Sequence, residues 1–515
     1  MSIRNFKKSK FIHFSLLVII VGFLYSNTLN LGFFSDDFLG IARYNKMGLG
    51  GLSNNYDNPF YMPFSFIFQA LELSFFKSYL AIKIINLLLF LSTSFLLYMI
   101  TTRILVISGN PKNKVSTTLI VTLLFLCSPY QTEAVNWFSS QAYLLSTFFA
   151  MLALHQLIKD TLKTNTAFYL YLLFFFFALL NKEISLILPF IAFFLRSLQS
   201  NNQKVNLRLF ILGNLIVLLV YFTLRYLYLG AFIGGYGIEA HTNLSPQILT
   251  YGIIAYLAKF FLYYRYLPQE LRLAIPIIIF LISFVIAILH YTRFGALTKN
   301  RGKLILVLLS IFIISLLPVL NLETSFLGNI QSDRYGYFPS IFFALFIGAS
   351  LRPIWPKLFF LTGITIVGLS SYLTIQTNTH WVEAKNIRDV FLSEITQLDD
   401  QKELILINLP DNYEGVYLFR HGFEQCINES LFNNLSIAYN HAITDNQQFK
   451  LKGSDSETNI EINEVLTQHH ERIPGISFLR QNRKTLMSIK HNDVPCGAIY
   501  FFDKVKLIKL KPSQQ

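Results

Sequence analysis

The sequence predicts an all-α polytopic membrane protein with about 11 transmembrane helices, followed by a small C-terminal α/β soluble domain. Hydrophobic residues make up 53% of the 515 residues and charged residues only 14%, whereas about a quarter of the residues of a soluble domain are charged. Apolar runs follow one another from residue 11 to residue 375, and the sequence after residue 380 has an ordinary soluble composition. We therefore expect a transmembrane domain at 1–375 and a soluble domain at 376–515.

A helix that crosses a bilayer needs about 20 mostly apolar residues. The candidate segments are 11–28, 80–102, 115–129, 138–158, 166–181, 184–199, 208–229, 248–266, 271–291, 303–321, 338–351 and 357–375. Basic residues within the first ten positions precede the first segment, and no small-residue cleavage site follows it. This pattern predicts an uncleaved signal anchor.

Short basic loops mark the cytoplasmic side of a membrane protein, and an even number of crossings must separate two such loops. The sequence meets this condition except between the loops at 196–208 and 293–303, which enclose three apolar segments. Segment 248–266 carries Lys259 and Arg265 among several tyrosines, so we expect a helix lying in the outer interface. An extracytoplasmic loop at 293–303 is the alternative. The prediction is a multi-pass protein of the cell (inner) membrane with a cytoplasmic N-terminus and an extracytoplasmic C-terminal domain.

Other overall properties give weaker indications. The formal net charge of +14 does not indicate a nucleic-acid partner, because the basic residues lie in short loops where membrane topology accounts for them. In the soluble part, Cys426 and Cys496 form a disulfide if they face an oxidising compartment, and two buried thiols are the alternative. An amphipathic helix is expected at 376–401, with Trp381, Phe391 and Ile395 on its apolar side.

The first candidate site is the acidic pair Asp36 and Asp37, which follows the first span and is flanked by phenylalanines. Two carboxylates at the edge of a bilayer are unfavourable unless they are paired or used. Adjacent like charges raise the pKa of one of them, which favours a general base near neutral pH. The alternative is a helix N-terminus, with Ser35 as the cap and the acids in the first turn.

Further candidates lie in the other segments predicted to be outside. Glu133 with Trp137 is either a substrate-facing acid or a solvated acid beside an interfacial tryptophan. Lys182 either neutralises Glu183 or binds an anionic lipid phosphate.

Two arginines are candidates for phosphate binding. Arg334 lies among aromatic residues and has the donor geometry for two phosphate oxygens. Arg225, near the outer end of segment 208–229, either plays the same role or extends to the interface. No glycine-rich phosphate loop and no Cys/His metal-ligand spacing occurs in the sequence.

These motifs occur in five longer stretches, which are NTLNLGFFSDDF at 27–38, SPYQTEAVNWFSSQAYLLSTFFAMLAL at 128–154, ALLNKEISLILPF at 178–190, YFTLRYLYLG at 221–230 and SDRYGYFPSIFFAL at 332–345. In them the chain resembles the membrane-embedded GT-C glycosyltransferases, most closely the transmembrane and tetratricopeptide-repeat protein O-mannosyltransferases and their bacterial relatives. The chain departs from the relatives at Gln141 and Tyr143, where they usually carry Arg and Asp. It also lacks a helical repeat of about 34 residues after the last span, so protein O-mannosylation is not carried over.

The resemblance implies transfer of a sugar, with inversion, from a polyprenyl-phosphate-linked donor to an acceptor hydroxyl on a glycan, lipid or protein. Asp37, or else Asp36, would be the general base, and Lys182, Arg334 and Arg225 would bind the donor phosphate. Substrate binding falls to Glu133, Glu183, Trp137, Tyr335 and Tyr337. No cofactor is expected, and a divalent metal is possible but not favoured. The alternatives are a transporter or flippase of lipid-linked glycans and a polysaccharide polymerase or ligase.

Overall fold

The computed structural model describes residues 3–48, 60–76, 78–107, 114–159, 164–199, 205–232, 245–268, 299–320, 322, 330–351, 356–396, 403–430, 436–441, 449–453, 457–462, 476–481, 484–490, 498–502 and 506–510. The predicted span 271–291 and Cys496 lie outside these residues. The chain divides into two compact units, of which unit 1 comprises Met1–Leu29 and Leu49–Asn378 and unit 2 comprises Asn30–Gly48 and Thr379–Gln515. Residues 30–48 thus belong with the C-terminal part, a grouping that hydropathy does not reveal.

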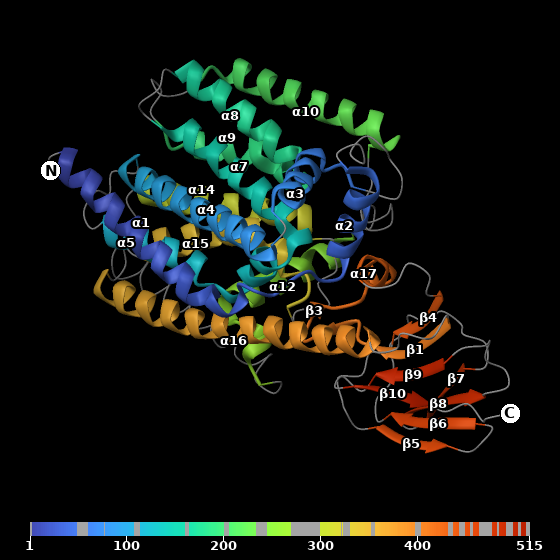
Figure 1. Ribbon diagram of the computed structural model, residues 1–515. Helices are drawn as coiled ribbons and strands as arrows, with labels where there is room; N and C mark the ends of the chain where they lie inside the picture. Colours follow the sequence, from blue (N-terminus) through green and yellow to red (C-terminus); the bar gives the residue numbers. More distant parts are fainter. Residues whose placement is uncertain are drawn as a thin grey trace. The chain divides into compact units, whose positions relative to one another are not determined.

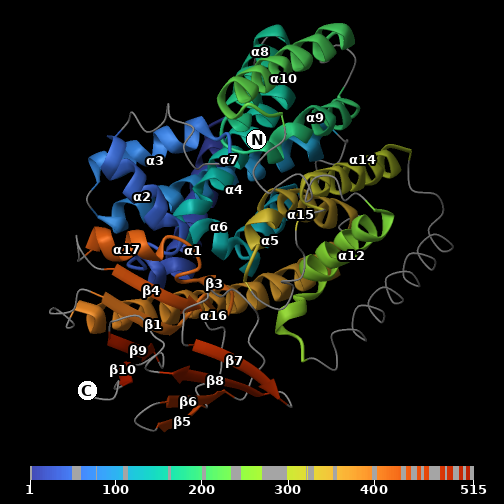
Figure 2. The same ribbon diagram turned by 90° about the vertical axis from the view of Figure 1, so that its right-hand side faces the viewer.

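Unit 1 is helical. Its elements are α1 (Ile3–Tyr25), α3 (Pro63–Phe75), α4 (Tyr79–Ile107), α5 (Lys114–Leu126), η3 (Pro129–Gln131), α6 (Thr132–Asn136), η4 (Phe138–Ser140), α7 (Gln141–Ile158), α8 (Thr164–Leu179), η5 (Glu183–Ile187), α9 (Leu188–Arg196), α10 (Leu207–Leu229), α12 (Pro246–Leu262), η7 (Tyr264–Tyr266), α14 (Lys299–Leu316), η10 (Asp333–Gly336), α15 (Tyr337–Leu351) and the first part of α16 (Pro356–Thr396) (Figure 1). Helix α7 packs on α4 and α8, and α15 packs on α5 and α14 (Figure 2). The core between these helices is rich in leucine and phenylalanine.

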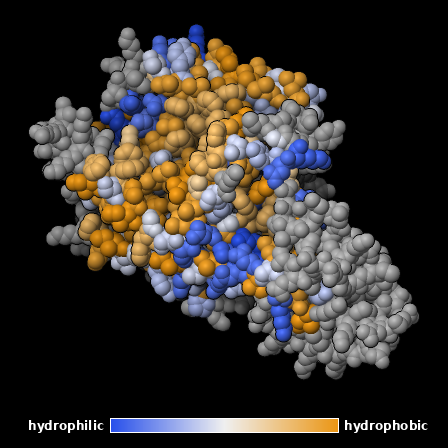
Figure 3. Space-filling model, viewed as in Figure 1, coloured by the Kyte–Doolittle hydropathy of each residue, from blue (hydrophilic) through white to orange (hydrophobic). Residues whose placement is uncertain are grey.

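Five helices in the described residues are long and apolar enough to cross a membrane: Phe11–Thr28, Tyr79–Ile107, Phe138–Ile158, Leu207–Leu229 and Phe360–Ile395. A sixth span results if Val115–Leu126 and Pro129–Asn136, which meet at an angle of 53°, count as one. Apolar side chains cover much of the visible face of unit 1 (Figure 3), and α10 exposes Leu212, Leu219 and Leu227. Exposed apolar helix faces of this kind are suited to a lipid environment, so the chain has the helices of a membrane protein.

Two expectations about the helices need correction. The sequence suggested a span at 357–375 and a separate amphipathic helix at 376–401, but α16 is one helix of 41 residues. The expected apolar side is present, because Trp381, Phe391 and Ile395 are buried. A solvated Glu133 was one of the two alternatives for its segment, but η3 and α6 are both buried.

Unit 2 contains α2 (Asp36–Met47), the distal part of α16, α17 (Phe423–Ser430) and two four-stranded sheets. The first sheet has the order β10-β9-β1-β4, from β1 (Glu403–Leu409), β4 (Ser436–His441), β9 (Ala498–Phe502) and β10 (Leu507–Leu510), with β1 parallel to both β4 and β9. The second has the antiparallel order β5-β6-β8-β7, from β5 (Phe449–Gly453), β6 (Glu457–Ile462), β7 (Ile476–Gln481) and β8 (Lys484–Lys490). A short hairpin joins β2 (Asn412–Tyr413) to β3 (Val416–Tyr417). Phe391 of α16 packs on Phe419, Phe423 and Phe502, which ties α16 to the rest of this unit.

Candidate functional site

A buried ion pair joins Glu133 of α6 to Arg334 of η10. The Arg334 guanidinium donates to Glu133 Oε1, and the Arg334 backbone N–H donates to Glu133 Oε2 at 2.6 Å. The Arg334 guanidinium carbon also lies 4.9 Å from the Trp137 ring centre and 4.6 Å from that of Tyr335. Glu133 is only 1% exposed, so a solvated acid beside an interfacial tryptophan does not describe it.

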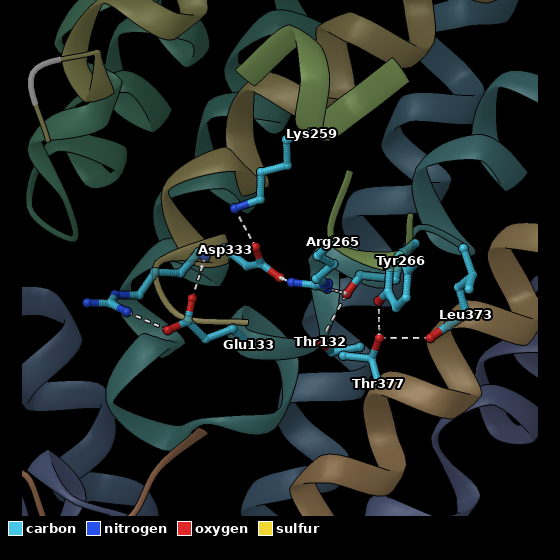
Figure 4. Close-up of polar contacts among 10 residues, drawn as sticks. Thr132, Glu133, Lys259, Arg265, Tyr266, Asp333, Leu373 and Thr377 are labelled. Carbon is cyan, nitrogen blue, oxygen red and sulfur yellow. Dashed lines mark hydrogen bonds and ion pairs between the residues drawn. The ribbon is translucent and has the colours of Figure 1, made fainter. Parts of the chain in front are cut away.

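The neighbouring residue Asp333 is fully buried between two cations (Figure 4). It pairs with Lys259 of α12 through Oδ1 and with Arg265 of η7 through Oδ2, the latter at 2.5 Å. Burial alone lowers the pKa of Arg265, but Asp333 outweighs this effect and the net shift is upward. The carboxylate therefore favours the charged form of Arg265 in a buried place and also pairs with Lys259.

We name Glu133, Lys259, Arg265, Asp333 and Arg334 the ionic cluster. Its position depends on the short helix α6 and on the turn before η10. Lys83 of α4 donates to the Val135 carbonyl oxygen at 3.1 Å and to the Asn136 side-chain oxygen, so it holds the C-terminal end of α6. Ser332 has a left-handed backbone conformation, φ +69°, directly before η10.

Lys182 lies in a second, aromatic-lined group of charges. Its ammonium nitrogen is 3.7 Å from Glu183 Oε1 and 4.2 Å from the Phe60 ring centre. Tyr143 lies beneath the same ammonium, at 5.4 Å, and also contacts Tyr335. Burial lowers the pKa of Lys182; Glu183 raises it and Arg334 and Arg225 lower it further, so these charges act on one another.

Arg225 belongs to the same group. It is 4% exposed and donates to the Tyr221 hydroxyl at 3.0 Å, so it does not extend to an aqueous interface. The cations of the two groups are Lys182, Arg225, Lys259, Arg265 and Arg334. With the three carboxylates Glu133, Glu183 and Asp333, these eight residues have a formal excess of two positive charges. Buried positive charge with aromatic walls suits an anionic ligand such as a phosphate ester.

The Glu183 carboxylate has a further feature. Its Oε2 atom is buried and has no hydrogen-bond partner within the described part of the chain. A buried carboxylate oxygen is unfavourable without a donor, and a hydroxyl group of a bound molecule would satisfy it.

The acidic pair lies in unit 2, at the N-terminus of α2. Asp36 is half-buried, whereas Asp37 is buried and its Oδ2 accepts a hydrogen bond from the Phe34 backbone N–H at 2.9 Å. Ser35 does not cap α2 with its side chain; its hydroxyl instead accepts from the His421 backbone N–H at 3.2 Å. The predicted helix N-terminus is therefore present, but Ser35 does not cap it with its side chain, and Asp37 binds the Phe34 N–H that precedes the helix.

The structure distributes the predicted residues unevenly. Glu133, Trp137, Tyr335 and Arg334 are in contact, and Lys182, Glu183 and Arg225 form the second group. Tyr337, which we expected to bind substrate, packs in the hydrophobic core against Phe90 and Phe125, and we leave it out of the proposed site.

Sequence reasoning missed four charged or acidic residues of this region: Lys259, Arg265, Asp333 and Glu72. The sequence places Lys259 and Arg265 in an interfacial helix because of their charges, but both of them pair with Asp333 within the protein. Glu72 of α3 is 3% exposed and accepts hydrogen bonds from Gln141. An acid within the apolar stretch LELSFF was the signal available for Glu72.

Among the described residues, no group of three or more His, Cys, Asp or Glu side chains is arranged to hold a metal ion. A comparison with protein-family models finds no match for the chain, and a comparison with curated proteins finds no similar sequence. Fold and site together define a helical membrane protein with buried, aromatic-lined charge in unit 1 and an acidic turn in unit 2.

Proposed function

We propose that this protein is a membrane glycosyltransferase that transfers a sugar from a polyprenyl-phosphate-linked donor to an acceptor hydroxyl on the extracytoplasmic side. The observation that carries the proposal is the excess of buried positive charge around Lys182, Arg225 and Arg334. A lipid-linked phosphodiester matches both this charge and the apolar helices around it.

In this proposal Lys182 and Arg225 bind the donor phosphate and stabilise the negative charge that develops as the lipid phosphate leaves. Lys182 is suited to this role because its buried ammonium lies between Glu183 and the rings of Phe60 and Tyr143. Arg334 is held more tightly by Glu133, so its guanidinium contributes long-range charge and orients Trp137 and Tyr335. The buried Glu183 Oε2 and the aromatic rings of Tyr143 and Tyr335 supply groups that recognise a sugar.

The acidic pair is the proposed source of the base. Transfer to a hydroxyl requires a group that accepts the hydroxyl proton as the new glycosidic bond forms. The resemblance favours Asp37 as this base, with Asp36 as the alternative. Asp37 is fixed by the Phe34 N–H, and Asp36 is the more exposed of the two, so each must be tested separately.

The proposal includes the finer topology predicted above, with eleven crossings, an N-terminus inside and a C-terminal part outside. Reporter fusions at Lys299 and Ser393 test it. We expect the fusion at Lys299 to be cytoplasmic and the fusion at Ser393 to be extracytoplasmic. Two fusions on the same side would contradict the topology.

The activity is tested with purified protein, polyprenyl phosphate carrying radiolabelled mannose, glucose or galactose, and a cell-envelope extract of glycans, lipids and proteins that supplies acceptor hydroxyls. We expect sugar transfer that the Asp37→Asn or Asp36→Asn substitution abolishes, and a Lys182→Gln substitution that raises the KM for the donor at least tenfold. The exposed Lys159→Gln is the matched control and should leave both constants unchanged. Donor movement across vesicle membranes without transfer would instead indicate a flippase. Full transfer by both aspartate variants would refute the proposed base.

A further inference from the structure

We propose that Arg388 of α16 is a positioning residue that fixes the Asp37 carboxylate through the Phe33–Phe34 peptide bond. Arg388 and the acidic turn both belong to unit 2. The inference rests on the proposed function, because a role for Asp37 in sugar transfer gives this fixation its purpose.

The central observation is that one peptide group is held from both sides. Arg388 Nη1 donates to the Phe33 carbonyl oxygen at 2.6 Å, and the Phe34 N–H of the same peptide group donates to Asp37 Oδ2 at 2.9 Å. A charged donor on the carbonyl polarises the peptide group and strengthens the hydrogen bond that its N–H donates. Arg388 thus acts on the Asp37 carboxylate through the backbone.

The Arg388 side chain is itself fixed. Its Nε and Nη2 atoms donate to Asp389 Oδ1 at 2.9 and 2.6 Å, and its guanidinium carbon lies 4.7 Å from the Phe34 ring centre. Phe34 packs edge-on against Trp381, one of the largest fully buried side chains. The guanidinium therefore cannot move away from the turn without losing contacts on three sides.

The backbone of the turn is shaped to admit this guanidinium. Gly32 has φ +77°, and a Cβ atom there would lie 2.9 Å from Arg388 Nη2. On the far side of the turn, the Ser35 N–H donates to the Leu418 carbonyl oxygen at 3.0 Å. A Cβ atom at Gly422 would lie 2.7 Å from the Ser35 carbonyl oxygen. The C-terminal part of the chain thus surrounds the acidic turn closely.

Full-length protein in detergent allows the fixation and its catalytic effect to be measured separately. Arg388→Met keeps the chain volume but removes the donor, and Arg388→Lys keeps a positive charge and one donor direction. The matched control is Arg420→Ala, which removes an arginine of the same unit that lies 5.2 Å from the Tyr417 ring centre and pairs with Asp411. The first measurement is amide hydrogen exchange of segment 30–38, and the second is transfer from the labelled polyprenyl-phosphate hexoses over pH 5.5–8.5.

We expect Arg388→Met to raise the exchange rate of the Phe34 amide about tenfold, and to lower kcat about ten- to a hundredfold with little change in KM. Its pH–rate profile should shift at the acid limb, because the Phe34 N–H, which favours the charged form of Asp37, then donates a weaker hydrogen bond. Arg388→Lys should restore part of kcat, and Arg420→Ala should match the wild type.

Two results would overturn the inference: unchanged protection of Phe34 in Arg388→Met, or lost protection with an unchanged kcat and pH profile. If the wild-type protein transfers no sugar, the proposed function fails. The exchange measurement still decides in that case whether Arg388 fixes the turn.

Discussion

Glu72 provides a prediction about stability that does not depend on the proposed activity. This residue of α3 is buried, and Gln141 Nε2 donates to its two carboxylate oxygens at 3.0 and 2.8 Å. Burial raises the pKa of Glu72, and the hydrogen bond from Gln141 lowers it by a smaller amount. The resulting pKa is about 8. Helix α3 has 13 residues and is not among the helices long enough to span a membrane.

The direction of the pH effect follows from proton binding. Between the unfolded pKa near 4.5 and the folded pKa near 8, the folded protein binds more protons at this site than the unfolded chain does. Stability therefore falls as the pH rises through this window, by at most about 1.4 kcal/mol per pH unit. Over the whole window the upper limit is about 5 kcal/mol.

The substitution Glu72→Gln tests this reasoning, because glutamine is neutral at every pH and keeps one acceptor for Gln141. Thermal unfolding in detergent should show the variant gaining stability relative to the wild type as the pH rises from 5.5 to 8.5. Glu424→Gln, at an exposed position of α17, is the control and should show no such trend. A difference between Glu72→Gln and the wild type that stays constant with pH would refute a protonated buried carboxyl.

Two further predictions concern other charged and backbone positions. Asp333→Asn leaves two buried cations without their carboxylate and should lower the free energy of unfolding by about 3–5 kcal/mol. Lys259→Met keeps the ion pair between Arg265 and Asp333 and should have a smaller effect. Equal losses of stability in thermal unfolding would contradict this prediction. Gly32→Ala should destabilise by about 1–3 kcal/mol, because of its positive φ and its contact with Arg388. The control is Gly40→Ala in helix α2, where a Cβ atom would meet open space, and this substitution should leave the stability unchanged or raise it. An equal loss of stability in both variants would argue against local strain at Gly32.

The hydropathy pattern was sufficient to locate the longest helices. Four predicted segments correspond to described helices that are long and apolar enough to span a membrane: 11–28, 80–102, 138–158 and 208–229. Hydropathy locates them because each is a long, mostly apolar run. The shorter segments were harder to assign, since a proline or a polar residue divides them. Segment 184–199, for example, consists of the 3₁₀ turn η5 followed by the nine-residue helix α9.

The candidate site was only partly predictable, and the reason is visible in the charged residues. A charge in a sequence window counts as unfavourable for burial, but the window contains no information about a partner far along the chain. Lys259 and Arg265 were therefore assigned to an aqueous interface, although Asp333 pairs with both of them. A charged residue is therefore weak evidence for an interfacial segment wherever a carboxylate elsewhere in the chain pairs with it.

Glu133 is a second residue whose partner the sequence does not reveal. Its partner Arg334 lies 201 residues away, so the sequence could present both as candidates without indicating that they bind each other. Their pairing changes the roles available to them, because the Arg334 guanidinium donates to the buried Glu133 carboxylate and to the Tyr335 hydroxyl. If the proposed function is correct, Lys182→Gln should therefore affect donor binding directly, and Glu133→Gln should act mainly by releasing Arg334 and disordering Trp137.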